Sequence, residues 1–306
     1  MTELTKLSQG GFQTARDCKR KFKYRYDMRL QRRGGDDSAA LNFGRLWHAV
    51  LAWGYSGGDN RRFNAAEFIA SKARSEDDAY RCIAMLKGYA TRWSSDEQPR
   101  AMSLSEQTID VPIRNPATGR ESRTFSQFGF LDMLALHNDG SIWLWEHKTA
   151  ASIGGGYIEK LFSDSQITGY YAALRDMGID VRGVVYDVAL KPKLRIKKNE
   201  TESEFYDRIA DWHMQPEAYH REEVYISDQQ VQDWREDVWM VTQEILAARR
   251  AGMWPRNTGR CFDYYSQCEY LPLCQNGAPE ALINAEYEMR ETPSNSDNAT
   301  TEKPVF

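Results

Sequence analysis

The sequence has no apolar stretch long enough to cross a membrane. A membrane-spanning helix takes about 18 or more consecutive apolar residues, and no run in the 306-residue chain reaches that length. Hydrophobic residues still make up 41% of the sequence, so a chain of this size can bury a substantial core. The composition predicts a folded protein with no membrane partner.

An excess of positive charge is also missing. The formal net charge is −4, whereas binding to polyanions such as DNA depends on lysine and arginine. Basic residues are instead concentrated in two segments, 19–33 and 191–198. The first also carries aromatic residues that can stack on unpaired bases, which favours single strands or frayed DNA ends. An ordinary solvated surface is the alternative for both segments.

A nucleotide-binding P-loop is absent as well. The glycine-rich stretch at 151–156 does not end in Gly-Lys-Ser or Gly-Lys-Thr, the ending that places a lysine and a hydroxyl on nucleotide phosphates. Nucleotide hydrolysis is therefore disfavoured. We expect this stretch to be a flexible loop.

Cysteine is scarce and unevenly distributed. Three of the five cysteines are close together near one end of the chain, a fourth lies near the other end, and the fifth stands in a helical pattern. The three neighbouring cysteines are Cys261, Cys268 and Cys274, the fourth is Cys18, and the fifth is Cys82. Residues 1–7 have no signal-peptide pattern, so we expect a cytoplasmic setting, where disulfides are rare. Disulfides and buried free thiols are therefore the less favoured interpretations of the cysteines.

The most informative pattern is an aromatic-rich β-hairpin predicted over residues 125–149. Alternating runs flank Asn138–Gly140, a three-residue loop with glycine where a left-handed backbone is needed. Counting back from this loop in antiparallel register places Asp132 directly opposite Glu146. Two carboxylates are thus predicted to share one face of the hairpin.

The chemistry of this face follows from spacing. Side chains two positions apart on a strand point the same way, so Lys148 joins Asp132 and Glu146. Opposed residues have Cβ atoms about 5 Å apart, and carboxylates that close repel each other unless a positive charge lies between them. A hard divalent cation with a lysine beside it meets this requirement. Spacing alone leaves open a surface hairpin whose charged side chains form solvated cross-strand pairs.

These residues resemble a known family signature. The order Gly129-x-x-Asp132, a turn, then Glu146-x-Lys148 is similar to the motif of the PD-(D/E)xK nuclease superfamily, and Leu131 stands where that motif has proline. The resemblance implies a fold with a mixed β-sheet and a metal-dependent hydrolysis of phosphodiester bonds.

Two further motifs resemble the RecB-like branch of that superfamily, and all occur in the family's order. Phe43–His48 is similar to its histidine motif, and Gln166 with Tyr170 matches its Gln-x-x-x-Tyr motif. Four residues apart, Gln166 and Tyr170 lie on one face of a predicted helix that runs to about Met177. The resemblance implies that they contact DNA or brace Lys148.

The resemblance also implies a set of metal ligands. Asp132, Glu146 and His48, with a backbone carbonyl near His147, would hold Mg²⁺ or Mn²⁺, which polarises the scissile phosphate and lowers the pKa of a bound water. Lys148 would orient that water or offset charge on the phosphate.

The one-plus-three arrangement of cysteines resembles the iron-sulfur nucleases of the same branch, namely the AddB-type subunit of recombination helicase-nucleases and the CRISPR adaptation nucleases. The resemblance implies that Cys18, Cys261, Cys268 and Cys274 ligate one 4Fe-4S cluster, which joins the chain ends and takes no part in hydrolysis. The spacing departs from the tighter Cys-x2-Cys start of some relatives. A zinc site with four cysteine ligands is the main alternative.

The expected fold class is α/β, with a mixed central β-sheet of the restriction-endonuclease-like type flanked by helices, helical insertions and an iron-sulfur clamp between the chain ends. A strand at 181–188 should follow the Gln166 helix and complete the sheet through a crossover. We expect one nuclease domain over 1–290 and a disordered, polar tail at 291–306. The parts of that domain are a basic and aromatic segment at 1–33, a helical part at 41–100, a catalytic core at 104–190, and a helical and cysteine-rich region at 201–290.

The functional hypothesis is a Mg²⁺- or Mn²⁺-dependent deoxyribonuclease, an exonuclease acting on DNA ends or single strands in recombination, repair or DNA processing. Recombination or replication proteins are expected partners, and the location is the cytoplasm, that of a host if the chain is phage-encoded. A non-catalytic DNA-end-binding protein that keeps the fold is the second hypothesis. The third is a zinc-stapled structural protein whose hairpin carboxylates do no chemistry.

Overall fold

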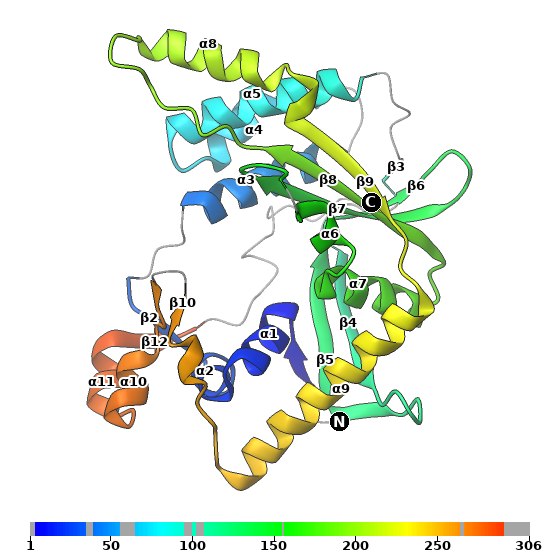
Figure 1. Ribbon diagram of the computed structural model, residues 1–306, viewed down its shortest axis with the longest axis vertical. Helices are drawn as coiled ribbons and strands as arrows, with labels where there is room; N and C mark the ends of the chain where they lie inside the picture. Colours follow the sequence, from blue (N-terminus) through cyan, green and yellow to red (C-terminus); the bar gives the residue numbers. More distant parts are fainter. Residues whose placement is uncertain are drawn as a thin grey trace. The chain divides into compact units, whose positions relative to one another are not determined.

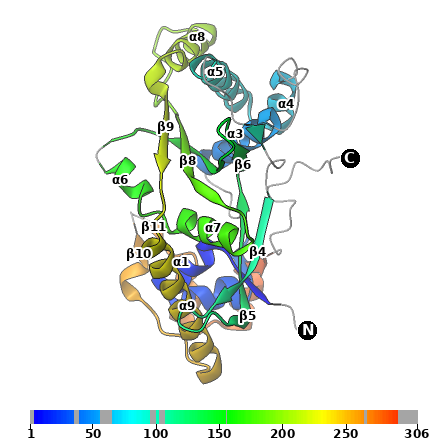
Figure 2. The ribbon, with the colours of Figure 1, turned by 90° about the vertical axis from the view of Figure 1, so that its right-hand side faces the viewer.

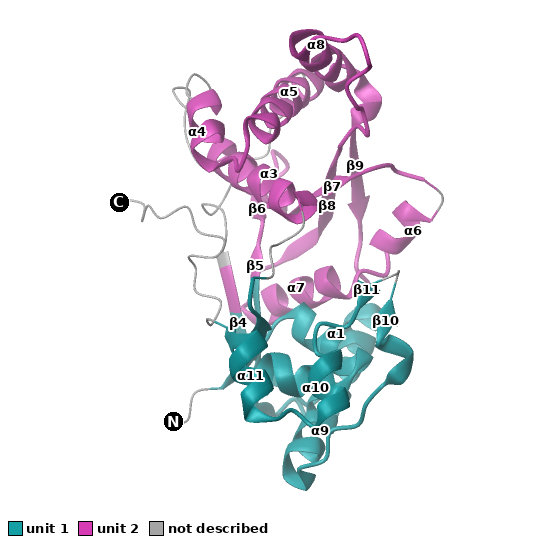
Figure 3. Ribbon diagram, turned by 90° about the vertical axis from the view of Figure 1, so that its left-hand side faces the viewer, with its two compact units in different colours: residues 1–36, 110–129, 228–297 teal, residues 37–109, 130–227, 298–306 magenta. Residues whose placement is uncertain are grey.

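The computed structural model divides the chain into two compact units (Figure 3). It describes residues 4–34, 39–55, 65–94, 100–101, 107–154, 156–263 and 266–290. Unit 1 comprises 1–36, 110–129 and 228–297, and unit 2 comprises 37–109, 130–227 and 298–306. The tail predicted to be disordered, 291–306, lies outside the described residues.

Unit 2 is built on a mixed sheet, as predicted. Among the described residues the sheet has five strands in the order β3-β6-β7-β8-β9, and β7 to β9 lie side by side in Figure 1. The pair β7 and β8 is parallel, and the other pairs are antiparallel. The strands are β3 (Arg100–Ala101), β6 (Met133–Leu136), β7 (Ile142–Ala150), β8 (Val181–Leu190) and β9 (Tyr219–Val224).

The hairpin formed by β6 and β7 has the register that its loop predicts. The His137 N–H donates to the Ser141 carbonyl oxygen at 2.9 Å, and Gly140 has the left-handed φ of +82° that the loop requires. Met133 pairs with Trp145, so the residues one step further along, Asp132 and Glu146, face each other.

The hairpin is shorter than predicted. The run from Phe125 was expected to continue into it, but β5 (Glu121–Leu131) ends before Asp132 and pairs with other strands. Its neighbours are β1 (Thr5–Leu7) and β4 (Gln107–Arg114). Asp132 itself lies in a bend between β5 and β6. A strand can change sheets without losing its alternating pattern, which is why the sequence reads as one continuous run.

Helices surround the sheet of unit 2 (Figures 1 and 2). The helical part predicted over 41–100 is helical at 39–55, 65–72 and 76–92, whereas 100–101 form β3, and 56–64 and 95–99 lie outside the described residues. The crossover from β7 to β8 runs through two helices, the second of which carries Gln166 as predicted. Side-chain caps begin α5, α7 and α8 at Ser75, Asp164 and Thr201, respectively. The helices are α3 (Ala39–Tyr55), α4 (Ala65–Lys72), α5 (Glu76–Arg92), α6 (Tyr157–Leu161), α7 (Ser165–Asp176) and α8 (Glu202–His213).

The region 201–290 was expected to be helical and cysteine-rich, and the strand β9 within it was not predicted. Its sequence, Tyr-His-Arg-Glu-Glu-Val, has too little apolar alternation to signal a strand. The strand forms because β8 offers it a buried partner, with Asp187 opposite Arg221.

Gly88 sets how α5 packs against the end of α8. A Cβ added at Gly88 would lie 2.0 Å from the carbonyl oxygen of His213 and 2.5 Å from the hydroxyl of Tyr219. Real side chains do not tolerate such distances, so only glycine allows this approach of helix to backbone. The contact holds α5 in place beside β9.

In unit 1 the two ends of the chain share one core. Strand β2 (Leu30–Arg32) pairs in antiparallel fashion with β12 (Tyr287–Met289). The core that they share is a cluster of five buried residues, namely Tyr24, Leu30, Tyr270, Leu273 and Tyr287. This unit also contains the helices α1 (Gln9–Asp17), α2 (Lys19–Phe22), the π-helical turn η1 (Lys23–Asp27), α9 (Asp228–Ala251), α10 (Leu271–Asn276) and α11 (Glu280–Glu286).

The basic and aromatic segment at 19–33 is largely used to hold these ends together. Lys19 pairs with Glu244 at 2.6 Å, and Arg25 pairs with Glu269 at 2.7 Å. Phe22 is fully buried. The interpretation that its aromatic residues stack on unpaired bases is therefore wrong for Phe22, and equally for the buried Tyr24.

In the described part of the chain, no helix is both long and apolar enough to span a bilayer.

The buried His213 makes a prediction about the pH dependence of stability. Burial lowers the pKa of its imidazole to about 4, and the positive charge of Arg81 acts in the same direction. In an unfolded chain histidine titrates near its ordinary pKa of about 6.5. The neutral imidazole therefore contributes its full stability above about pH 6.5, and this contribution falls as the pH drops toward 4, by up to roughly 3 kcal/mol.

Urea unfolding at a series of pH values tests the role of His213. We expect His213→Gln to flatten the fall in unfolding free energy between about pH 6.5 and 4. The matched variant His220→Gln changes a half-exposed histidine on β9 of the same unit and should keep the wild-type profile. An identical profile for His213→Gln and wild type would contradict the assignment.

Candidate active site

The predicted carboxylates meet at the bend that precedes β6. The His48 ring, on α3, lies with Nδ1 3.0 Å from Oδ1 of Asp132. The backbone N–H of His147, on β7, donates to Oδ2 of the same carboxylate at 2.8 Å. Both oxygens of Asp132 are therefore held, one by a ring nitrogen and the other by a backbone amide.

Glu146 is held on one side only. Its side chain is 3% exposed, and Oε1 accepts a hydrogen bond from Nζ of Lys148. Its other oxygen, Oε2, is buried without a hydrogen-bond partner among the described residues. An unsatisfied buried carboxylate oxygen is costly, so this atom is the one that a bound cation would satisfy.

The two carboxylates differ in their electrostatic surroundings. Burial would raise the pKa of Asp132, but His48 and His147 outweigh it and lower that pKa below its ordinary value. Burial raises the pKa of Glu146, and the neighbouring Asp132 raises it further. For Lys148, burial favours the neutral amine, yet the Glu146 carboxylate outweighs it and raises the pKa of Lys148. The site thus concentrates negative charge that its own lysine only partly offsets.

Helix α7 brings Gln166 and Tyr170 to the same side of the sheet. Nε2 of Gln166 donates to the Tyr170 hydroxyl at 3.3 Å, so the two side chains share one face of the helix as predicted. Burial raises the pKa of Tyr170, and the charges of Glu146 and Asp132 add to the increase, which places Tyr170 near both carboxylates. Asp164, the N-cap of α7, contributes to the raised pKa of Lys148 and was not expected at the site.

His147 makes contacts that were not predicted for it. Its backbone was expected to offer a carbonyl to a metal ion, and that role remains a prediction, whereas its backbone N–H holds Asp132. Its side chain points to the other face of the sheet and meets Asp187 of β8, with Nδ1 2.9 Å from Oδ2. Arg221 of β9 and Tyr89 of α5 also hydrogen-bond Asp187.

These partners of His147 were missed from the sequence. Strand alternation does place His147 opposite in direction to Glu146 and Lys148. The register between parallel strands, however, is set across a long crossover, so nothing local shows that Asp187 lies beside His147.

The donor set at the bend fits a divalent cation of the Mg²⁺ or Mn²⁺ type. Carboxylate oxygens are the ligands that such cations prefer, and Oε2 of Glu146, which has no hydrogen-bond partner among the residues that the structure describes, is available as one. No three His, Cys, Asp or Glu side chains within the described ranges are arranged as a ready-made metal centre. Binding would therefore require His48, Asp132 and Glu146 to adjust from the hydrogen-bonded arrangement seen here.

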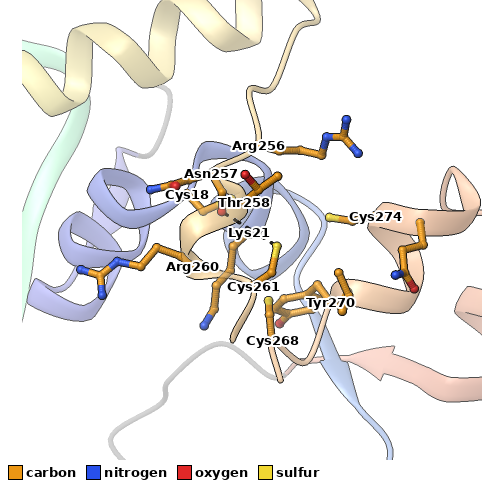
Figure 4. A pocket seen from close by; sticks show the side chains of 12 residues that line it. Cys18, Lys21, Arg256, Asn257, Thr258, Arg260, Cys261, Cys268, Tyr270 and Cys274 are labelled. Atoms are coloured by element: carbon orange, nitrogen blue, oxygen red, sulfur yellow. Dashed lines mark hydrogen bonds between the residues drawn. The ribbon is translucent and has the colours of Figure 1, made fainter. Parts of the chain in front are cut away.

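The cysteines form a second candidate site in unit 1. Cys18 comes together with Cys261, Cys268 and Cys274 around one pocket of about 220 Å³ (Figure 4). Burial raises the pKa of the Cys274 thiol, and the charges of the three neighbouring cysteines raise it further. Cys82, by contrast, is fully buried in α5, where burial raises the pKa of its thiol to about 12.

The donor chemistry of the pocket is that of a thiolate-bound metal or cluster, but the four sulfurs, like the other candidate ligands among the described residues, are not arranged as a ready-made metal centre. Four sulfur donors around one space are the ligand set of zinc and of iron-sulfur clusters. A bound cationic centre would favour the thiolates that burial disfavours. Lys21, Arg256 and Arg260 also line the pocket.

Comparison with known proteins gives one family match. The sequence matches the profile described as the PD-(D/E)XK nuclease superfamily over residues 6–275. No curated protein matches the chain significantly.

Two solved structures show only a weak similarity. One is the crystal structure of a "putative exonuclease" from Eubacterium rectale, at 11% identity and a TM-score of 0.45, covering 84% of this chain and 86% of that one. The other is the crystal structure of SSO0001, at 11% identity and a TM-score of 0.32, covering 79% and 78%. With both TM-scores below 0.5, neither supports a functional conclusion.

Cation binding at the carboxylate pair should stabilise the protein. At a Mn²⁺ concentration 100 times the dissociation constant, a ligand that binds only the folded state adds about 2.7 kcal/mol. We expect a rise in the melting temperature of the wild type on adding Mn²⁺, and loss of most of that rise in Glu146→Gln. Scanning calorimetry with and without Mn²⁺ measures both.

The control for this experiment is the same substitution on β9, which is separated from β7 by β8. Glu222, on β9, hydrogen-bonds His220 and makes no described contact with Asp132. Glu222→Gln should therefore keep the full Mn²⁺-dependent rise. A rise of equal size in Glu146→Gln would show that the cation binds elsewhere.

Proposed function

The chain belongs to the PD-(D/E)XK nuclease superfamily, and from this premise we propose that it is a Mg²⁺- or Mn²⁺-dependent deoxyribonuclease. The observation that carries the proposal is the convergence of Asp132, Glu146 and Lys148, with one carboxylate oxygen of Glu146 buried and lacking a hydrogen-bond partner within the described segments. A degenerate site that only binds DNA would have little reason to keep all three.

Each side chain has a role that its surroundings support. Asp132 and Glu146, with His48, would hold the cation, which supplies polarisation of the scissile phosphate and a lowered pKa for a bound water. Lys148 keeps its charge beside Glu146 and would offset negative charge that develops on the phosphate. Tyr170 and Gln166 would brace this arrangement or contact DNA from α7.

We further propose that the enzyme is an exonuclease of the RecB-like branch, acting on DNA ends or single strands. The support is the resemblance of Phe43–His48 and of Gln166 with Tyr170 to motifs of that branch. Exposed basic residues at Lys193, Arg195, Lys197 and Lys198 would contact the phosphate backbone. Action in recombination, repair or DNA processing, with recombination or replication proteins as partners and a cytoplasmic location, belongs to this proposal.

We also propose a 4Fe-4S cluster at the cysteine pocket, as in AddB-type and CRISPR adaptation nucleases, with four-cysteine zinc as the alternative. Support comes from the meeting of Cys18 with Cys261, Cys268 and Cys274 around one pocket. The cluster would reinforce ends that already share a β-sheet and a core. Its role would be structural, because every residue that lines the pocket lies in unit 1 and the carboxylates lie in unit 2.

A nuclease assay tests the catalytic proposal. Labelled linear duplex, linear single strands and closed single-stranded circles are incubated with Mn²⁺ and either wild type or Lys148→Ala. We expect the wild type to degrade linear substrates and the variant to be slower by about 100-fold or more, because a charge that stabilises the transition state is lost. Lys160→Ala, an exposed lysine of α6, is the matched control and should cut normally.

Three outcomes of the assay would count against parts of the proposal. Equal cutting by wild type and Lys148→Ala removes the catalytic assignment. Cutting of closed circles removes the exonuclease assignment. Tight binding to DNA ends with no cutting by the wild type favours the alternative, a non-catalytic DNA-end-binding protein.

Anaerobic purification tests the cluster. We expect visible absorbance from iron-sulfur charge transfer, with iron and sulfide in equal amounts, in wild type and in Cys82→Ala, and loss of both in Cys274→Ala. Cys274→Ala should melt at a lower temperature but keep Mn²⁺-dependent cutting. A colourless wild type with bound zinc would replace the cluster by a zinc site, and loss of Mn²⁺ binding in folded Cys274→Ala would show that the two sites are not independent.

A further inference from the structure

A row of hydrogen-bonded polar side chains crosses three strands on the far face of the sheet from Glu146 and Lys148. His147 of β7 is in register with Asp187 of β8, and Asp187 is in register with Arg221 of β9. Residues in register on neighbouring strands project to the same face. The active-site strand therefore carries, between its two functional residues, a side chain that is tied to the next two strands.

Asp187 is the centre of this row. Its side chain is 1% exposed, and it accepts hydrogen bonds from Nδ1 of His147 at 2.9 Å, from Nε of Arg221 at 3.1 Å, and from the hydroxyl of Tyr89. A buried charge persists only when its partners satisfy it, and removing one partner leaves an uncompensated charge. The ring of His147 is thereby fixed by an acceptor that cannot move without losing its other bonds.

Residues of two helices, α5 and α3, pack against this row. Tyr89 of α5 hydrogen-bonds Tyr55 of α3 at 2.8 Å between the hydroxyls, and the Tyr55 ring stacks on the His147 ring at 5.8 Å between centroids and an angle of 14°. The Arg221 guanidinium lies over the Trp93 ring at 3.9 Å. His147 is thus held at its edge by Asp187 and on its face by Tyr55.

Fixing the ring of His147 also fixes the backbone that bears it. The N–H of His147 donates to Oδ2 of Asp132, and that oxygen belongs to a residue in a bend rather than in a strand. A bend has no ladder of hydrogen bonds to set its side chain, so the direction of the carboxylate depends on the two groups that hold its oxygens, the His147 amide on Oδ2 and the His48 ring on Oδ1.

We propose that Asp187, Tyr89 and Arg221 are positioning residues of the cation site, acting through His147 on the carboxylate of Asp132. This inference deepens the proposed function and rests on the proposed cation site. Partners that orient a metal ligand are commonly worth 10- to 100-fold in metal affinity. The row contributes no ligand of its own and touches no substrate.

Mn²⁺ affinity measured by calorimetry tests the proposal with two tyrosine-to-phenylalanine variants. Tyr89→Phe removes the hydroxyl that Asp187 accepts from, and Tyr219→Phe removes a buried hydroxyl that donates to the Met85 carbonyl oxygen at 2.7 Å in the same core. We expect Tyr89→Phe to weaken Mn²⁺ binding several-fold and Tyr219→Phe to leave it unchanged. Asp187→Asn should weaken binding by about 10-fold or more.

Equal affinity for Mn²⁺ in wild type and folded Asp187→Asn would overturn the proposal. So would equal losses in Tyr89→Phe and Tyr219→Phe, because that result would follow from general loss of stability. Melting temperatures measured alongside establish that each variant is folded and that the two tyrosine variants are comparably stable.

Hydrogen exchange separates this inference from the proposed function, because it needs neither metal nor DNA. In metal-free protein, the amide of His147 should exchange several-fold faster in Tyr89→Phe than in wild type, and at the wild-type rate in Tyr219→Phe. Unchanged exchange in Tyr89→Phe would overturn the positioning role. If the exchange and Mn²⁺ results hold but the wild type cuts no DNA, the nuclease proposal fails while the positioning role stands.

Discussion

Repulsion between two buried carboxylates is the interaction on which the rest of unit 2 depends. Asp132 and Glu146 face each other across the β6–β7 hairpin, and each raises the electrostatic cost of ionising the other. The surrounding residues offset this electrostatic cost more fully for Asp132 than for Glu146. Asp132 is stabilised as an anion by His48 and His147, whereas Glu146 has Lys148 on one oxygen and no hydrogen-bond partner from the described part of the chain on the other. Such unequal treatment of paired titratable groups is typical of sites built for chemistry.

How far this arrangement could be predicted depends on how local each part of it is. The facing of Asp132 and Glu146 follows from a three-residue loop, and Gln166 with Tyr170 follows from helical spacing, so both were accessible from the sequence. The row formed by His147, Asp187 and Arg221 was not accessible. It depends on a parallel register set across a crossover and on β9, a strand whose polar sequence carries no strand signal of its own.

The same contrast applies to the chain ends. Four cysteines pointed to a connection between the N-terminal and C-terminal segments, and the structure shows that β2 and β12, an aromatic core and several ion pairs already make one. Charge alternation near Cys18 suggested nucleic-acid contact because lysine and arginine look alike in sequence whether they face phosphate or glutamate. Only the positions of Glu244 and Glu269 decide between these readings for Lys19 and Arg25.

The absence of a side chain at Gly88 has a consequence for how this protein can change. Its neighbour Tyr89 hydrogen-bonds Asp187, and Gly88 itself packs closely against the backbone of His213 at the end of α8. The packing of α8 is therefore linked through α5 to Asp187. An evolutionary or engineered change at the end of α8 would alter the position of α5 and, through it, the contact with Asp187 in the sheet. Substitutions at the end of α8 should therefore be tolerated as poorly as substitutions in a core strand.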